Sequence, residues 1–153
     1  PKLKWIGYLS TVGVYGNHNG GWVDEETPVK PASERSRQRV KAEAEWLATG
    51  KQAKLPVSIF RLSGIYGPGR NALKAAQEGK ARRLVKEGQV FNRIHVGDIA
   101  TAVKAAAENE TSGIFNITDK QYWEWETARL LTADDRINSE AARSVRVGLT
   151  LDF

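Results

Sequence analysis

The sequence predicts an α/β fold with a parallel sheet. Residues 5–9, 55–62 and 113–117 are apolar stretches rich in residues that favour strands. Segments with helical character and one apolar face separate them, at residues 33–49 and 99–108. Strands that alternate with helices at this spacing build parallel sheets, so the order of the elements gives the fold class.

The first predicted strand ends at a pair of hydroxyl residues. Residues 5–9 form its apolar part, and Ser10 and Thr11 follow at its carboxyl end. Ligands of open parallel sheets bind just beyond the carboxyl ends of strands. A hydroxyl there can hydrogen-bond a substrate oxygen that gains or loses a proton. The alternative is a strand end that only begins a turn.

A polar loop over residues 17–31 leads to the first predicted helix. Ser33 is expected to cap this helix at its start, and Gly50 is expected to end it after Thr49. The spacing of its apolar residues indicates one common face, formed by Val40, Ala44 and Leu47.

The second predicted strand, residues 55–62, has the continuous apolar character of a buried parallel strand. It ends in the turn-rich segment 63–69, where a ligand would lie. A short helix is expected at 71–77, and strand with loop at 85–96. Asp98 is expected to cap the following helix, whose apolar face contains Ile99, Val103 and Ala106.

The composition is that of one ordinary globular domain, with 153 residues, 41% hydrophobic and 27% charged. No apolar run is long enough to span a membrane and no signal peptide is evident, so we expect a cytoplasmic protein without membrane contact. The chain has no cysteine, and its two histidines lie far apart, so no metal site is expected. A net charge of +5 permits nucleic-acid binding, but acidic residues interleave with the basic ones, which argues against it.

The chain has no methionine, and Pro1 leads directly into the first strand. These two observations predict a fragment whose upstream part is missing.

Four motifs carry a resemblance to a known family: LSTVGVYG at residues 9–16, FRLSGIYGPG at 60–69, RIHVGDIA at 93–100 and GIFNI at 113–117. In order and spacing the chain resembles the extended short-chain dehydrogenase/reductase family, in its atypical, NAD(P)-dependent epimerase/dehydratase-like branch. The resemblance implies the carboxyl-terminal portion of a Rossmann-type parallel sheet with a small substrate-binding region. It also implies NAD or NADP as cofactor and a small hydroxyl or carbonyl substrate, with nucleotide sugars as one candidate. A homodimer stays open.

The resemblance covers about residues 3–119, and we expect residues 1–119 to form a partial NAD(P)-binding domain with part of the substrate region. Residues 120–153 are expected to be a divergent tail, in which 121–131 has the pattern of an amphipathic helix. The family's glycine-rich phosphate-binding turn is absent from the chain, so the chain alone is expected to be inactive and to bind the cofactor negligibly.

The resemblance assigns catalytic roles residue by residue. Thr11 matches the family's active-site Ser/Thr. Where the family has its Tyr-x-x-x-Lys pair, this chain has Arg35 and Arg39, followed by Glu43 at the family's acidic position. A guanidinium cannot take a proton from a hydroxyl, but it can stabilise developing negative charge or grip ribose or phosphate. The alternative for both arginines is a solvated basic helix face.

The resemblance also predicts binding residues. Cofactor contacts are expected from Ser10, Thr11, Arg39, Leu62, Ser63 and Gly64. Arg70 and Arg93 are candidates for an anionic substrate, with a surface role as the alternative; the position that often holds the family's phosphate-binding arginine is Phe91 here. Ser63 and Gly64 replace the family's usual aromatic–Asn pair, which alters the pocket. Packing or structural roles are expected for Tyr15, Tyr66 and His95.

Three functions remain open at this point. The first is an NAD(P)-dependent oxidoreductase or epimerase/dehydratase in which Thr11 orients the substrate. The second is a non-catalytic dinucleotide-binding or regulatory protein of the same fold, because the Tyr/Lys pair is replaced. The third is a basic nucleic-acid-associated domain, which rests on charge alone.

Overall fold

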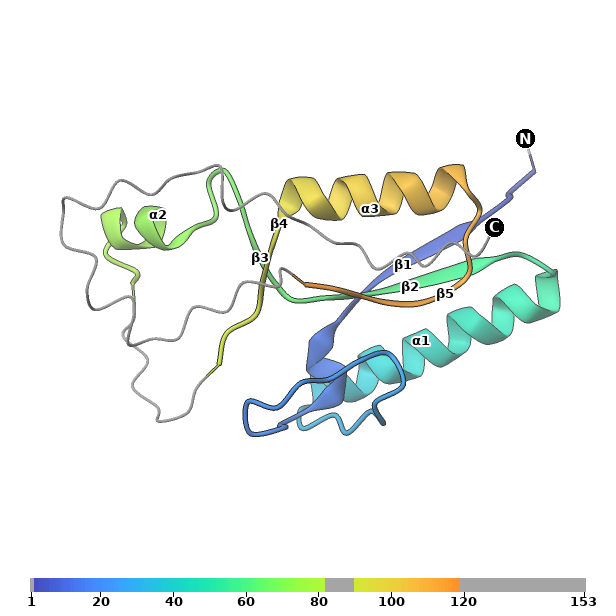
Figure 1. The fold of residues 1–153 in the computed structure, drawn as a ribbon, viewed down its shortest axis with the longest axis horizontal. Coiled ribbons are helices and arrows are strands. Elements are labelled where there is room, and N and C mark those ends of the chain that lie inside the picture. The colour runs from blue at the N-terminus through green and yellow to red at the C-terminus, as the bar shows by residue number, and fades with distance from the viewer. Residues whose placement is uncertain (1, 82–89, 119–153) are drawn as a thin grey trace.

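The computed structural model describes residues 2–81 and 90–118 of the chain. It has three layers: helix α3 (Val96–Glu108) covers one side of a parallel sheet and helix α1 (Glu34–Ala53) covers the other (Figure 1). The predicted α/β fold with a parallel sheet is confirmed.

The central strand of the sheet is β2 (Val57–Leu62), which lies between β1 (Ile6–Thr11) and β5 (Gly113–Ile117). Both pairings are parallel, and Thr11 lies opposite Leu62. All residues of β2 are buried, as expected for a parallel strand covered on both faces. The three strands therefore end at one edge of the sheet, the edge where ligands of such sheets bind.

A second unit of two parallel strands follows β2 in the chain. It consists of β3 (Gly64–Tyr66) and β4 (Arg93–His95), with Gly64 opposite Arg93. Helix α2 (Ala72–Gln77) follows β3. Figure 1 shows this unit and α2 beyond the end of the three-stranded sheet, on the side where β2 ends.

The apolar core lies between the sheet and α3. Its buried members come from β2, β4, α3 and β5: Phe60, Leu62, Ile94, Ile99, Ala102, Ala106 and Ile117. The ring of Phe60 stacks on that of Phe115, with 5.8 Å between ring centroids. The face of α3 is as predicted, since Ile99 and Ala106 are buried and Val103 packs partly against the same cluster. Burying each of the large side chains contributes about 1.5–3 kcal/mol.

Helix α1 begins as predicted but continues past its predicted end. The side chain of Ser33 accepts a hydrogen bond from the backbone N–H of Ser36, which is the expected cap. Gly50 does not end the helix, which stops at Lys54 in a left-handed conformation. Gly50 is needed for space instead, because a Cβ there would lie 2.1 Å from the Cγ2 atom of Val57.

The predicted cap of α3 is also wrong. His95 is the N-cap residue, and its Nδ1 atom accepts a hydrogen bond from the backbone N–H of Gly97 at 3.1 Å. Asp98 lies in the first turn, where a negative charge is favoured by the helix dipole. The ring of His95 also packs edge-on against Tyr66, so the structural roles predicted for both residues are confirmed.

The predicted apolar face of α1 is not the face that packs on the sheet. Ala44 and Leu47 are exposed and Val40 is half-buried, whereas Glu43 and Gly50 are buried. The reason lies in the sheet, which presents the charged Arg61 on this side, so that the helix contacts it through a carboxylate.

Several expectations fall outside the described residues, namely those on 85–89 within the predicted strand and loop, and on the tail 120–153 with its helix at 121–131. Within residues 2–81 and 90–118, no helix is long and apolar enough to cross a membrane. The same residues contain no group of three or more histidines, cysteines or carboxylates suited to a metal ion.

Candidate functional site

Thr11 stands at the carboxyl end of β1 and starts the short 3-10 helix η1 (Val12–Tyr15). Its Oγ1 atom accepts a hydrogen bond from the backbone N–H of Gly13 at 3.1 Å. This bond uses a lone pair of the hydroxyl and leaves its proton free to be donated. Thr11 is half-buried and so can offer a hydrogen-bond donor at the edge where the three strands end.

A buried polar network anchors the chain on both sides of Thr11. Ser10 donates to Oε1 of Glu43 at 2.5 Å, and Nη2 of Arg61 donates to Oε2 of Glu43 at 2.8 Å. Nη1 of Arg61 donates to the hydroxyl of Tyr15 at 2.8 Å. All four side chains belong to residues that are at most 6% exposed. Ser10 directly precedes Thr11 and Tyr15 ends η1, so the network fixes the short segment that carries Thr11.

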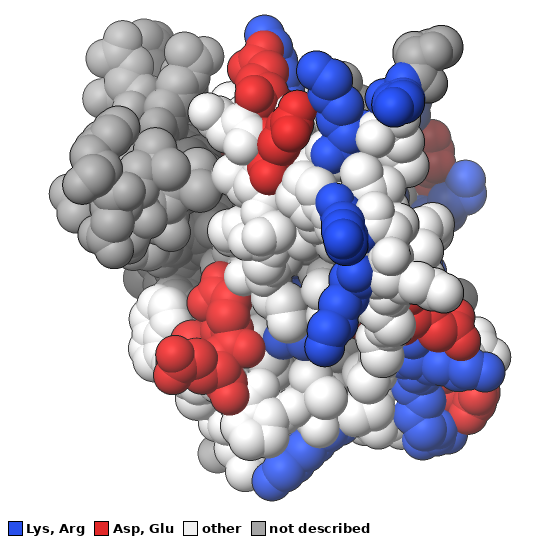
Figure 2. Space-filling model, turned by 90° about the vertical axis from the view of Figure 1, so that its right-hand side faces the viewer, with Lys and Arg blue, Asp and Glu red and all other residues white. Residues whose placement is uncertain are grey.

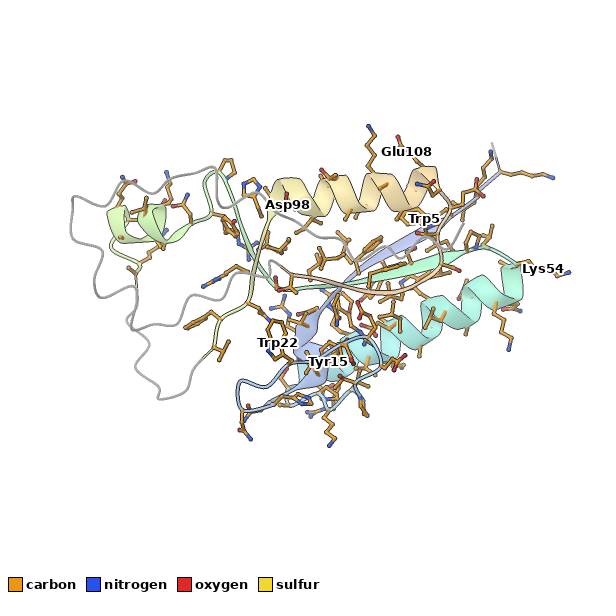
Figure 3. All side chains as sticks on the ribbon, viewed as in Figure 1. Trp5, Tyr15, Trp22, Lys54, Asp98 and Glu108 are labelled. Carbon is orange, nitrogen blue, oxygen red and sulfur yellow. The ribbon has the colours of Figure 1, made fainter. Side chains whose placement is uncertain are left out.

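The network reaches β5 and the loop before α1. The hydroxyl of Tyr15 donates to Oδ1 of Asn116 at 2.8 Å, and the backbone N–H of Asn116 donates to Oε1 of Glu25 at 2.6 Å. Figure 3 shows Tyr15 on the α1 side of the sheet, whereas Trp5 lies on the α3 side. Every strand of the three-stranded sheet thus contributes to the network on its α1 side.

The guanidinium of Arg61, at the centre of the network, stays charged. Burial alone would lower the pKa of Arg61, but its hydrogen bonds to Glu43 and Tyr15 outweigh burial and raise the pKa above its ordinary value. The predicted packing role of Tyr15 is confirmed by its burial, and its hydroxyl has a second task as a hydrogen-bond partner of the pair.

The residues predicted to contact the cofactor at the end of β2 have different surroundings. Leu62 belongs to the apolar core. Ser63 is 6% exposed, and its Oγ atom has no hydrogen-bond partner within the described parts of the chain. Leaving such a buried hydroxyl unsatisfied costs about 1–3 kcal/mol. A polar group of a ligand could serve as the partner of this hydroxyl. Ser63 directly follows Leu62, and Leu62 pairs with Thr11 across the two strands.

The two arginines predicted to act together on α1 do not do so. Nη1 of Arg39 donates to the hydroxyl of Tyr8 at 2.9 Å and to the carbonyl of Leu9 at 3.4 Å. Arg35 is exposed and makes no hydrogen bond or ion pair with another described residue. The Arg39–Tyr8 contact is no substitute for a Tyr/Lys pair at the site, because Tyr8 lies three residues before Thr11, about 10 Å along the strand.

Arg70 and Arg93 lie at opposite ends of the β3–β4 unit. Arg93 begins β4 opposite Gly64, whereas Arg70 follows β3 and forms an isolated bridge with Gly67. Both are exposed. The pairing does not bring the two predicted anion-binding residues together.

Arg61, Asn116 and Glu25 are members of the network that the sequence reasoning missed, and Arg61 is the central one. The signal for Arg61 was available, because a single charge in the largely apolar run of residues 57–62 requires a buried partner.

On the surface, charges of both signs occur together. On the face drawn in Figure 2, basic and acidic side chains are interspersed.

Comparison with known proteins gives a family match over most of the chain. A family model described as the NAD dependent epimerase/dehydratase family matches residues 3–118. A protein of unknown function from Silicibacter pomeroyi is 48% identical, with a TM-score of 0.70 over 76% of this chain and 41% of that one. A dTDP-glucose 4,6-dehydratase from Bacillus anthracis, solved with NAD, is 30% identical, with a TM-score of 0.65 over 78% of this chain and 42% of that one.

A UDP-N-acetylglucosamine 4-epimerase from Methanobrevibacter ruminantium, solved with UDP-N-acetylmuramic acid, is similar in fold. It is 20% identical, with a TM-score of 0.70 over 82% of this chain and 44% of that one. The chain thus spans less than half the length of these three structures. Among curated proteins, none matches the chain.

Proposed function

Since the chain belongs to the NAD-dependent epimerase/dehydratase family, we propose that the natural protein carrying it is an NAD(P)-dependent oxidoreductase or epimerase/dehydratase. Its proposed substrate is a small hydroxyl or carbonyl compound, with nucleotide sugars as the leading class. The observation that carries the proposal is Thr11, a hydroxyl with a free proton at the carboxyl end of β1, held between two buried anchors.

Thr11 is proposed to donate a hydrogen bond to the substrate oxygen that changes its protonation state. The nicotinamide cofactor, when bound, accepts or returns a hydride. The unpartnered hydroxyl of Ser63 supports a polar cofactor group beside the end of β2. The proposed cofactor contacts are those at the two strand ends and on α1: Ser10, Thr11, Arg39, Leu62, Ser63 and Gly64. The hydroxyl of Ser10 already donates to Glu43, so it could meet the cofactor only as an acceptor.

The proton itself needs another carrier. A guanidinium is not a proton acceptor in proteins, so neither Arg35 nor Arg39 can take this role. A bound water, or a group outside the described residues, is therefore proposed to move it. Arg39, held by Tyr8 and by the carbonyl of Leu9, is proposed to act through its charge alone.

A second candidate function has support of its own. A dinucleotide-binding protein without catalysis would keep the fold and need no Tyr/Lys pair, and the arginines at positions 35 and 39, where the resemblance expects that pair, support this function. Thr11 would then help to bind a ligand without reacting with it. Both functions require cofactor binding, and turnover distinguishes them.

The test is made on the natural protein, including any sequence that flanks residues 1–153. Binding of NADH and NADPH is followed by their fluorescence, and turnover is measured on a panel of carbonyl compounds and nucleotide sugars. Thr11→Val is expected to lower kcat/KM by at least about 10²-fold, the usual effect of losing one positioned donor. Thr11→Ser retains the hydroxyl and is expected to keep most of the activity.

Circular dichroism of both variants checks folding, because Thr11→Val also removes the cap of η1. Full activity in a folded Thr11→Val protein would refute the catalytic assignment. Cofactor binding without turnover on any compound would favour the second candidate, and no cofactor binding would exclude both.

A further inference from the structure

Gly64 leaves a space that the side chain of Arg93 occupies. A Cβ at position 64 would lie 3.0 Å from Nη1 of Arg93, 3.2 Å from its Cδ and 3.0 Å from the carbonyl oxygen of Asn92. The φ angle of Gly64 is not among the positive ones, so other residues could adopt this backbone conformation. Space, and not backbone freedom, is therefore what glycine provides here.

The guanidinium of Arg93 is held in place but not neutralised. It lies 5.6 Å from the ring centroid of Phe91, within the range of a cation–π contact. None of the ion pairs among the described residues involves Arg93. An ordered guanidinium without a carboxylate beside it can still form paired hydrogen bonds with an anionic group from outside.

Two strand pairings connect Arg93 with the proposed reaction site. Thr11 lies opposite Leu62, Ser63 and Gly64 come next in the chain, and Gly64 lies opposite Arg93. The proposed catalytic hydroxyl and the guanidinium are thus connected by two strand pairings, Thr11 with Leu62 and Gly64 with Arg93. A small substrate that contacts Thr11 would have its far end near Arg93.

We propose that Gly64 and Arg93 together determine specificity for a substrate with a carboxylate group: Gly64 leaves the space in which the Arg93 side chain lies, and the guanidinium of Arg93 binds the carboxylate. This proposal rests on the proposed function, because it assigns one end of the substrate of the same site. It makes the substrate class an acidic sugar or a similar hydroxy or carbonyl acid.

A carboxylate suits this site better than a phosphate or diphosphate. The planar guanidinium presents two parallel N–H groups, which match the two oxygens of one carboxylate. A diphosphate carries more charge and is usually met by several donors, such as a helix N-terminus with added cations. Arg70, the other predicted anion-binding residue, is at the far end of the β3–β4 unit.

The test compares ligands that differ only in the acid group. Binding of UDP-glucuronate and UDP-glucose, and of D-glucuronate and D-glucose, is measured by calorimetry on the natural protein saturated with NAD or NADP. In at least one pair the acid is expected to bind about 10-fold or more tightly, equivalent to about 1.4 kcal/mol. Arg93→Gln is expected to reduce this ratio to about one while the neutral ligand keeps its affinity.

A second variant moves the guanidinium without removing its charge. Gly64→Ala introduces a Cβ against Arg93 and is expected to lower the same ratio at least about 3-fold, in proportion to the displaced hydrogen bonds. Arg37→Gln is the control, because Arg37 is an exposed arginine on α1 that pairs with Glu34. It is expected to leave the ratio unchanged.

The outcomes separate this proposal from the proposed function. If the protein binds the cofactor but prefers neither acid over its neutral counterpart, the proposed carboxylate specificity is wrong and the proposed function is unaffected. A preference that persists in Arg93→Gln, or a dependence on the diphosphate alone, would also overturn the carboxylate specificity. A protein that binds neither NAD nor NADP would contradict the proposed function and, with it, this assignment.

Discussion

The two faces of the central strand β2 are built from opposite chemistry. On the side of α3, Phe60 and Leu62 pack into a cluster of apolar side chains. On the side of α1, Arg61 forms a buried ion pair with Glu43 and hydrogen-bonds to Tyr15. An apolar cluster tolerates the replacement of one side chain by another of similar volume with a small loss of stability. A buried charged network is stable only while each charged or polar group keeps its partner. The segment that carries Thr11 depends on the charged side, since Ser10 and Tyr15 hold this segment through the network.

The largest effect is expected when one partner of the buried pair is removed. Glu43→Gln leaves the guanidinium of Arg61 buried without a counter-charge, and this should lower the free energy of unfolding by about 3–5 kcal/mol. The double variant Glu43→Leu/Arg61→Met replaces both charges by apolar groups and should recover much of that loss. Urea unfolding of the natural protein measures both.

If the network also positions Thr11, the double variant should be folded yet impaired. Its kcat/KM should fall although its stability is largely restored, because Ser10 has lost its partner Glu43 and Tyr15 has lost its partner Arg61. A double variant as active as the wild type would show that the two faces differ only in stability and not in function. Equal stability losses in the single and double variants would contradict the all-or-none behaviour of the network.

A smaller effect is expected on the apolar face. Ile99 is 7% exposed in the core cluster, and Ile99→Val removes one methylene from it. The free energy of unfolding should fall by about 0.5–1.5 kcal/mol, as is usual for this change. Activity at a fixed temperature well below unfolding should not change. A loss of activity without a loss of stability would mean that the apolar face also positions the site.

Sequence reasoning succeeded where the pattern is local and apolar. Strands β1, β2 and β5, the face of α3 and the Ser33 cap follow from periodicity and capping chemistry. The prediction of a turn-rich segment at 63–69 was wrong in part, because residues 64–66 form β3 by pairing with β4. Sequence reasoning failed where a distant contact decides. Gly50 is inside α1 because Val57 approaches it closely, and His95 takes the cap expected of Asp98. The pairing of Glu43 with Arg61 joins residues 18 apart in the chain, and no local pattern reports it.

The smallest effect should come from an ion pair of nearly the same length on the surface of α1. The Arg37–Glu34 distance is 2.9 Å against 2.8 Å for Arg61–Glu43, but the side chains of the surface pair are 55% and 69% exposed and those of the buried pair 5% each. Water screens the surface pair and solvates either partner alone, so Arg37→Ala should change the free energy of unfolding by no more than about 0.5 kcal/mol. Urea unfolding at low and high salt measures it, and the small difference should shrink further with salt. A loss above about 1.5 kcal/mol would mean that the short length common to both ion pairs sets their strength, and that burial does not separate the two regions. The contrast drawn between the faces of β2 would then have to rest on Arg61 itself and not on its surroundings.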